Sequence, residues 1–171
     1  MGLADRRTVE RGALVTALVL LFGRSVAEAE DRVRGELLAD LLSGREEDPA
    51  RLRERARRQG SDLDRPNVVA VASVTTLDRH RAAQVAARLA NELHGLGGDH
   101  EGNIVLVVPP VIPEDAVATG RLLQQRLRAV GGAATVGVFP ADSGPQGVAA
   151  AYHEAALPVS AAHAGQARRG Q

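Results

Sequence analysis

Apolar residues recur along the first forty positions at the spacing of one face of an α-helix. Steps of three or four residues separate the members of this stripe, which are Val15, Leu18, Phe22, Val26, Ala29, Val33 and Leu37. The spacing predicts one nearly straight helix from about Arg6 to Ser43. A helix of that length cannot bury its stripe against itself, so it needs a partner helix from the same fold or from a second copy of the chain.

After this helix the pattern alternates between short apolar runs and helical segments. Asp48 and Pro49 are typical of a helix start, and Gly60 is typical of a stop, so a short helix is predicted from Pro49 to Gln59. A loop at 61–66, pinned by Leu63, leads into the remaining elements. The apolar runs predict strands at 67–74, 104–108 and 134–139, and the helical spacing predicts helices at 77–94, 114–130 and 148–156.

The order of these elements predicts an α+β fold. A short strand at Leu96–His100, forming a hairpin with Ile104–Val108, would complete the series βαββαβ. We therefore expect an antiparallel sheet with helices on one face, in which the run Asn67–Val74 is apolar enough to be a central strand. Nucleotide-cyclase palm domains share this ferredoxin-like plan with many unrelated proteins, so the fold alone does not decide the function.

Composition excludes several classes of protein. The 171 residues are 44% hydrophobic with a formal net charge of zero, which excludes a disordered polyelectrolyte. Aromatic residues make up 2%, so bases would find almost nothing to stack on. All 21 basic residues are Arg and are matched by 21 acidic residues along the chain, so we expect no direct nucleic-acid binding. The absence of Cys excludes disulfides, thiolate catalysis and Cys-based zinc sites.

The first thirty residues also have the outline of a secretory signal. Arginines precede an apolar run at Ala13–Phe22, and Ala27–Ala29 has the small residues of a cleavage site. Two observations favour a dimerisation helix: acidic residues stand among the arginines, and the helical stripe continues unbroken to Leu42. The run is also shorter than the ~20 residues that span a bilayer. We expect a cytoplasmic protein outside the membrane, with a secreted small domain as the alternative.

One short segment suggests chemistry. Gly97–Glu101 reads GGDHE and resembles the GGDEF turn of diguanylate cyclases, whose glycines approach nucleotide phosphates and whose acidic residues hold Mg²⁺. His100 interrupts the acid pair, and two further residues precede the next strand. The end of the first strand, Val71–Thr76, supplies no second carboxylate, and Asp78 falls in the following helix. We expect a polar hairpin turn without catalysis, and a cyclase-like, nucleotide-binding enzyme is the alternative.

Neither the histidines nor the arginines define another site. His100, between Asp99 and Glu101, is interpreted as part of a surface turn, and His94 lies near a helix C-terminus. The other three histidines lack partners at metal-ligand spacing: His80, His153 and His163. The Arg-rich face of the short helix is interpreted as solvated and balanced by nearby acids, which are Glu46, Glu47, Asp48 and Glu54. No metal, cofactor or catalytic residue is predicted.

A longer series of segments carries a family resemblance. It begins with ERGALVTALVLLFGRSVAEAEDRVRGELLADLLSGREEDPARLRERARRQGSDLDRP and continues through HRAAQVAARLANELHGL, EGNIVLVVP, QQRLRAV, ATVGV and AAAYHEA. In this order the segments, spanning Asp5–Ala156, resemble actinobacterial transcriptional regulators of the PucR/CdaR type. The resemblance implies a linker helix and a degenerate GGDEF-like domain. In that family this is a non-catalytic regulatory and oligomerising module between a sensor and a helix-turn-helix.

The resemblance ends near Ala155. Pro158 is expected to break the last helix, and Gly165 and Gly170 are expected to loosen the chain beyond it. We therefore divide the chain into a dimerisation helix at 1–44, a GGDEF-like domain at 45–156 and a disordered or atypical tail at 157–171. A truncated regulator without its helix-turn-helix would explain this ending. The predicted partner is a second copy of the chain, with the helix seam formed by Val15, Leu18, Phe22, Val26, Ala29 and Val33.

Overall fold

The computed structural model describes residues 3–45 and 48–169. Its contacts divide the chain into two units, Met1–Val33 and Arg34–Gln171. The first unit contains most of helix α1 (Leu3–Ser43). The second contains the last turns of α1 and all the later elements: α2 (Pro49–Arg58), β1 (Asn67–Val74), α3 (Arg79–Glu92), β2 (Leu96–His100), β3 (Asn103–Val108), α4 (Ala116–Ala129), β4 (Ala134–Ala141) and α5 (Pro145–Arg169).

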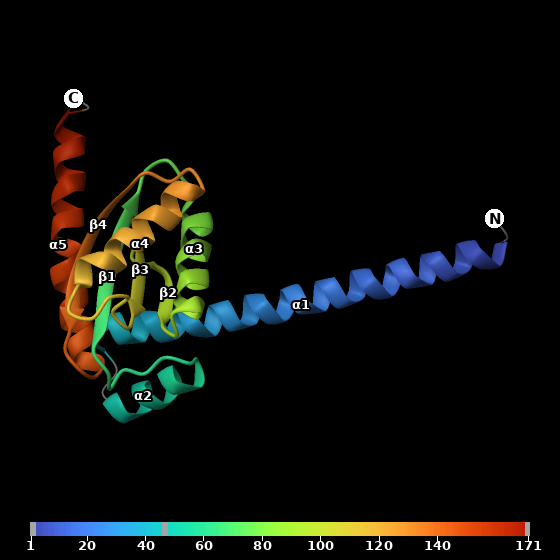
Figure 1. The fold of residues 1–171 in the computed structure, drawn as a ribbon, viewed down its shortest axis with the longest axis horizontal. Coiled ribbons are helices and arrows are strands. Elements are labelled where there is room, and N and C mark those ends of the chain that lie inside the picture. The colour runs from blue at the N-terminus through green and yellow to red at the C-terminus, as the bar shows by residue number, and fades with distance from the viewer. Residues whose placement is uncertain (1–2, 46–47, 170–171) are drawn as a thin grey trace. The chain divides into compact units, whose positions relative to one another are not determined.

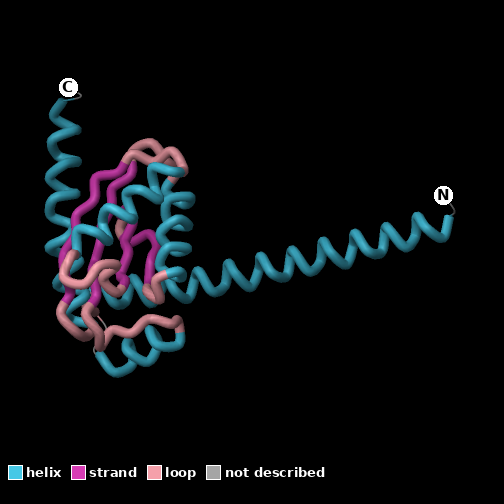
Figure 2. The backbone as a smooth tube through the Cα atoms, viewed as in Figure 1, coloured by secondary structure: helices cyan, strands magenta, loops and turns pink. Residues whose placement is uncertain are grey.

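The second unit is built on one four-stranded antiparallel sheet with the strand order β2-β3-β1-β4 (Figures 1 and 2). From β1 to β4 the elements form the series βαββαβ, so the predicted fold class is confirmed, including the short strand β2. β1 lies between β3 and β4, and all its residues from Asn67 to Ser73 are buried. The prediction of a central strand from its mostly apolar sequence is therefore confirmed.

Helices cover both faces of this sheet, which corrects the expectation of helices on one face. On one face α3 and α4 pack against Ala70, Ala72 and Leu106. On the other face α5 and the end of α1 share a core with Val69, Val71 and Val107, and α2 adds Leu52 and Ala56 to the same core. The alternate residues of β1 thus enter two separate cores. The five central residues of β1, Val68–Ala72, are all apolar. A strand of this kind must be buried on both faces, because either face would otherwise expose apolar side chains to water.

The predicted helix starts and the loop anchor between α1 and α3 are present in the structure. Asp48 caps α2 by accepting hydrogen bonds from the backbone N–H groups of Ala50 and Arg51, at 2.9 and 3.4 Å. Pro49 opens the helix, where its missing N–H is not needed. Leu63 is 1% exposed and anchors the loop before β1. Asp78 caps α3 by accepting from the N–H of Arg81, so it precedes this helix instead of lying in its first turn.

Helix α5 continues through Pro158 to Arg169, so the predicted break at this proline is wrong. Ala155 and Val159, on either side of Pro158, are both 1% exposed in the core. A proline inside a helix removes one backbone hydrogen bond, and burial on both sides of it compensates. Gly137 of β4 makes room for the contact, since a Cβ there would lie 2.0 Å from the carbonyl oxygen of Ala155.

Candidate functional site

The segment that resembles a cyclase signature lies in the β2–β3 hairpin, but not at its turn. His100 pairs with Asn103, so the two turn residues are Glu101 and Gly102. Their φ angles of 50° and 85° are both positive, as a two-residue type I′ hairpin turn requires. Gly97 and Gly98 instead lie inside β2, paired with Leu106 and Val105. The predicted strand at Leu96–His100 is thus confirmed, and the expected polar turn includes only Glu101 of the GGDHE segment.

A helix lies on each side of this glycine pair, and only Gly97 is approached too closely for a side chain. A Cβ added to Gly97 would lie 2.6 Å from the carbonyl oxygen of Ala86 and 3.1 Å from the Cβ of Ala90, both in α3. A Cβ added to Gly98 would point to the opposite face, 3.7 Å from the Leu38 side chain of α1. The glycines thus serve helix–strand packing. A phosphate group has no access to the backbone on the α3 side, because the helix backbone already occupies that space.

The end of β1 lies at the same end of the sheet as the hairpin turn. Ala72 pairs with Ile104, the second residue of β3. The residues beyond Ala72, Ser73–Thr76, supply hydroxyl groups and no carboxylate. Asp99 accepts a hydrogen bond from the N–H of Gly102 at 3.3 Å, and its carboxylate lies 3.5 Å from the Nε of Arg79. Asp99 therefore stabilises the turn and pairs with a cation.

His100 contacts α5 and is buried, which corrects its interpretation as part of a surface turn. It is 8% exposed, and its ring lies edge-on to that of Tyr152, with 5.2 Å between centroids. Burial raises the pKa of Tyr152 above its ordinary value, a hydrogen bond with Asn103 lowers it, and the charge of Glu101 raises it further. The hairpin is thus fastened to α5 by the only tyrosine of the chain.

Metal ligation finds no support among the described residues, where no group of three His, Asp or Glu side chains could hold an ion. His80 lies 3.0 Å from the amide nitrogen of Gln84, and His153 lies beside Tyr152. His94 comes after α3 with a φ of 57°. The side chain of His163 lies outside the described residues. The absence of a metal stays a prediction.

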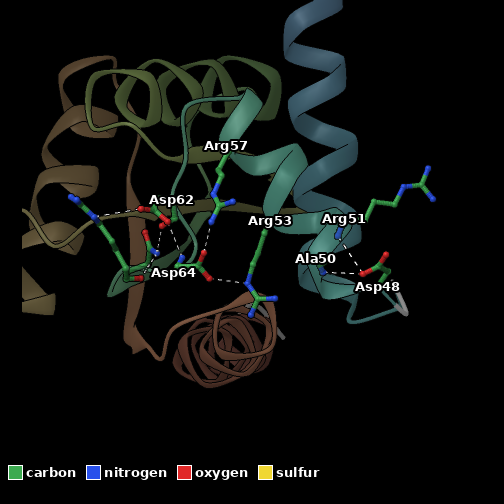
Figure 3. A network of polar contacts seen from close by, with 9 residues as sticks. Asp48, Ala50, Arg51, Arg53, Arg57, Asp62 and Asp64 are labelled. Carbon is green, nitrogen blue, oxygen red and sulfur yellow. Dashed lines mark hydrogen bonds and ion pairs between the residues drawn. The ribbon is translucent and has the colours of Figure 1, made fainter.

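Four arginines of α2 are paired with acids, and Figure 3 shows two of them, Arg53 and Arg57, beside Asp64. Asp64 accepts from Arg53 at 2.8 Å and from Arg57 at 2.7 Å, each with a separate carboxylate oxygen. Two further pairs involve arginines of the same helix: Arg58 with Glu54, and Arg55 with Asp40. Of the acids expected to balance this face, Glu54 does so and Asp48 serves as a cap. Glu46 and Glu47 lie outside the described residues. These pairs leave little free positive charge for an anion or for DNA.

A hollow of about 390 Å³ lies where the end of α1, α2 and the start of α5 meet. Its lining is aliphatic apart from one amide, and consists of Leu41, Gly44, Pro49, Leu52, Pro145, Gln146 and Ala149. A nucleotide needs several placed polar or cationic groups, which this lining does not supply.

Helix α1 presents its apolar residues to solvent in the single chain. Leu18 is 58% exposed and Phe22 is 74% exposed, and all six predicted seam residues are exposed. Among the described helices, α1 is also the one that is long and apolar enough to cross a membrane, and none of its apolar window is buried. Signal sequences near an N-terminus have the same property, so this observation supports a membrane span only weakly.

The sheet and its helices define an α+β domain with the element series βαββαβ. The model of the GGDEF-like domain family matches residues 43–157, more than half of the chain, and the protein belongs to this family. The match begins at the last residue of α1 and ends inside α5. Comparisons with curated proteins and with solved structures gave no match.

Proposed function

We propose that this chain is a non-catalytic regulatory and oligomerising module of a PucR/CdaR-type transcriptional regulator. It acts in the cytoplasm and associates with further copies of itself through α1, with a homodimer as the smallest assembly. Its GGDEF-like domain binds no cofactor. The membership of the GGDEF-like family supports this proposal, and the resemblance of the linker and domain to PucR/CdaR-type regulators supplies its finer part.

The observation that carries the non-catalytic part is the position of Gly97 and Gly98 inside β2. The cyclase mechanism requires glycine backbone that a phosphate can approach and two carboxylates that share a metal ion. Here the backbone of Gly97 lies against Ala86 of α3, and Asp99 is paired with Arg79. The end of β1 carries hydroxyl groups where the second carboxylate would be needed.

Titration calorimetry with GTP and Mg²⁺ tests this part. We expect no saturable heat from the wild-type chain, and the same result from Asp99→Ala. Saturable heat with a sub-millimolar Kd in the wild type, lost in Asp99→Ala, would contradict the proposal and favour the alternative, a residual nucleotide-binding or cyclase-like enzyme. Heat that survives Asp99→Ala would place nucleotide binding elsewhere and would also contradict it.

Self-association rests on the exposed apolar stripe of α1. A fully buried Leu or Phe side chain stabilises an assembly by about 1.5–3 kcal/mol relative to exposure, so a seam of six residues supplies enough energy for specific contact. At tens of micromolar protein a Kd near 1 μM gives mostly associated chains. Sedimentation as a monomer at that concentration would contradict the oligomerising role.

A further inference from the structure

We infer that the outer face of α3 and α4 binds the phosphate backbone of double-stranded nucleic acid, without reading its sequence. The observation behind this inference is a concentration of arginine on these two helices. Together α3 and α4 contain six Arg and one acidic residue, Glu92. Over the whole chain 21 Arg are balanced by 21 acidic residues, which predicts no direct nucleic-acid binding. That balance hides a local excess of positive charge on the side of the sheet where both helices pack (Figure 1).

Two arginines on each of these helices point away from the sheet. Successive residues of an α-helix turn by about 100°, which places Arg81 and Arg88 about 125° and 145° from the middle of the buried side of α3. On the same scale Arg121 and Arg128 lie about 145° and 125° from the middle of the buried side of α4. All four residues are exposed, so their guanidinium groups are accessible on the outer face of the helix layer.

Acidic side chains do not compensate these four outer arginines. Among the residues that the structure describes, none of the four forms an ion pair with a carboxylate. Glu92 accepts hydrogen bonds from Arg126 with both of its oxygens, at 3.2 and 2.8 Å. The acids just before the two helices, Asp78 and Asp115, accept from backbone N–H groups as caps. In the described part of the chain, the charge of the four outer arginines is therefore available to a ligand.

The outer arginines have the same spacing on both helices. The two members of each pair are seven residues apart, so they lie on one side of the helix at a separation of about 10 Å. Gln84 of α3 and Gln125 of α4 lie between them, each about 175° from the buried side. The outermost row of each helix thus reads Arg, Gln, Arg. Duplex DNA carries one negative charge per about 1.7 Å of its axis, so guanidinium groups at this separation all meet phosphates.

The chemistry of these rows favours duplex phosphate over other partners. Guanidinium groups bind phosphate through two parallel hydrogen bonds, and amide side chains such as Gln contact phosphate and sugar. A protein partner needs an apolar or aromatic centre to its interface, whereas the outermost positions here are Arg and Gln. Single strands are held by stacking on aromatic side chains, and neither helix contains Phe, Tyr or Trp. The binding is therefore electrostatic and independent of base sequence.

Fluorescence anisotropy of a labelled DNA duplex, titrated with the full chain at ~50 mM salt, tests this inference. For the wild type we expect the logarithm of the association constant to fall with the logarithm of the salt concentration at a slope of about −3.6, for four phosphates at about −0.9 each. The outer-face variants are Arg81→Gln with Arg88→Gln, and Arg121→Gln with Arg128→Gln. Each should halve the slope to about −1.8 and weaken binding at ~50 mM salt by at least about tenfold.

The matched control is Arg51→Gln with Arg58→Gln. It removes two exposed arginines from α2 and lowers the net charge by the same amount as each outer-face variant. We expect its affinity and its salt slope to stay close to those of the wild type, because these arginines lie outside the outer face of α3 and α4. All the substituted residues are exposed, so circular dichroism should show every variant folded.

Four results would overturn the inference. The first is a wild-type chain that leaves the anisotropy of the duplex unchanged, and the second is an α2 control that binds as weakly as the outer-face variants. The third is flotation with vesicles of phosphatidylserine and phosphatidylcholine, lost in the outer-face variants, without duplex binding, which would favour anionic lipid. The fourth is tighter binding of polyglutamate than of duplex at the same salt, which would favour an acidic protein partner. Each of these results leaves the proposed regulatory and oligomerising role intact, because that role rests on α1 and on the family.

Discussion

The carbonyl oxygen of Ala86 lies 2.6 Å from the point where a side chain at Gly97 would place its Cβ. Real Cβ atoms do not come this close to backbone oxygen, so α3 packs on β2 at a distance that only glycine permits. Its neighbour Gly98 has ordinary space, with Leu38 at 3.7 Å. Two adjacent glycines in one strand thus have different requirements, because alternate residues of a strand face opposite sides of the sheet.

We expect Gly97→Ala to lower the free energy of unfolding by about 1–3 kcal/mol, since α3 must move away from β2 to admit a methyl group. Gly98→Ala is the matched control in the same strand and should change stability by less than about 0.5 kcal/mol. Urea unfolding followed by circular dichroism measures both. Equal effects of the two substitutions would contradict the packing role of Gly97.

The carboxylates beside the turn should contribute little to stability. Asp99→Ala and Glu101→Ala are each expected to shift the free energy of unfolding within about 0.5 kcal/mol, as exposed ion pairs and surface groups do. Neither should alter the response to GTP and Mg²⁺. Urea unfolding measures the stability of each variant, and a loss of about 2 kcal/mol or more would show that these acids are structurally essential instead.

Charge on the seam should act on assembly and leave the domain intact. The double variant Leu18→Glu with Phe22→Glu is expected to give a monomer. Its urea midpoint for the GGDEF-like domain should match that of Ala27→Glu, a control substitution on α1 outside the seam. The reason is that both substituted residues belong to the unit Met1–Val33, whereas the two cores of the domain lie within Arg34–Gln171. A seam variant whose domain unfolds earlier than the control would show that assembly and domain stability are linked.

Alkaline pH should destabilise the fold through Tyr152. Burial raises the pKa of this phenol in the folded state, so above a pH of about 10 the unfolded chain loses its proton first. The unfolded chain then binds fewer protons, and stability falls with rising pH, by at most about 1.4 kcal/mol per pH unit, until the folded tyrosine also ionises. The chain contains no Lys, Cys or second Tyr, so no other side chain titrates in this window.

Tyr152→Phe is the control for that experiment. It loses the hydrogen bond with Asn103, which we expect to cost about 1 kcal/mol at neutral pH, but its stability should stay flat between pH of about 9 and 11. Urea midpoints measured across that range decide the matter. A wild-type chain with the same flat profile as the phenylalanine variant would contradict the raised pKa.

Much of the fold could be predicted because local patterns and tertiary packing agree. The apolar run Asn67–Val74, the Asp48–Pro49 start and the hairpin partner strand all appeared where expected. The run does not alternate between apolar and polar residues, which indicates that both faces of the strand are covered, although helices were expected on one face only. The extension of α5 through Pro158 could not be predicted locally, because burial of Ala155 and Val159 overrides the preference of proline.

The hairpin was harder to predict for a related reason. The register depends on a positive φ at Glu101, a conformation that this residue type seldom adopts, so the glycines were the more natural choice for the turn. The burial of His100 depends on Tyr152, which is distant in sequence and arrives only when α5 packs on the sheet. The segment GGDHE resembles the cyclase signature, but the strand register places its glycines inside β2 and only Glu101 in the turn.

Because aromatic residues are scarce, the fluorescence of Tyr152 reports on its contact with His100. With one tyrosine and no tryptophan, the intrinsic fluorescence of the chain arises from a single buried ring between the hairpin and α5. A change in emission therefore indicates that the β2–β3 hairpin has separated from α5. Circular dichroism, which all five helices dominate, supplies an independent signal. Comparing the two separates undocking of α5 from loss of the helices, without any added label.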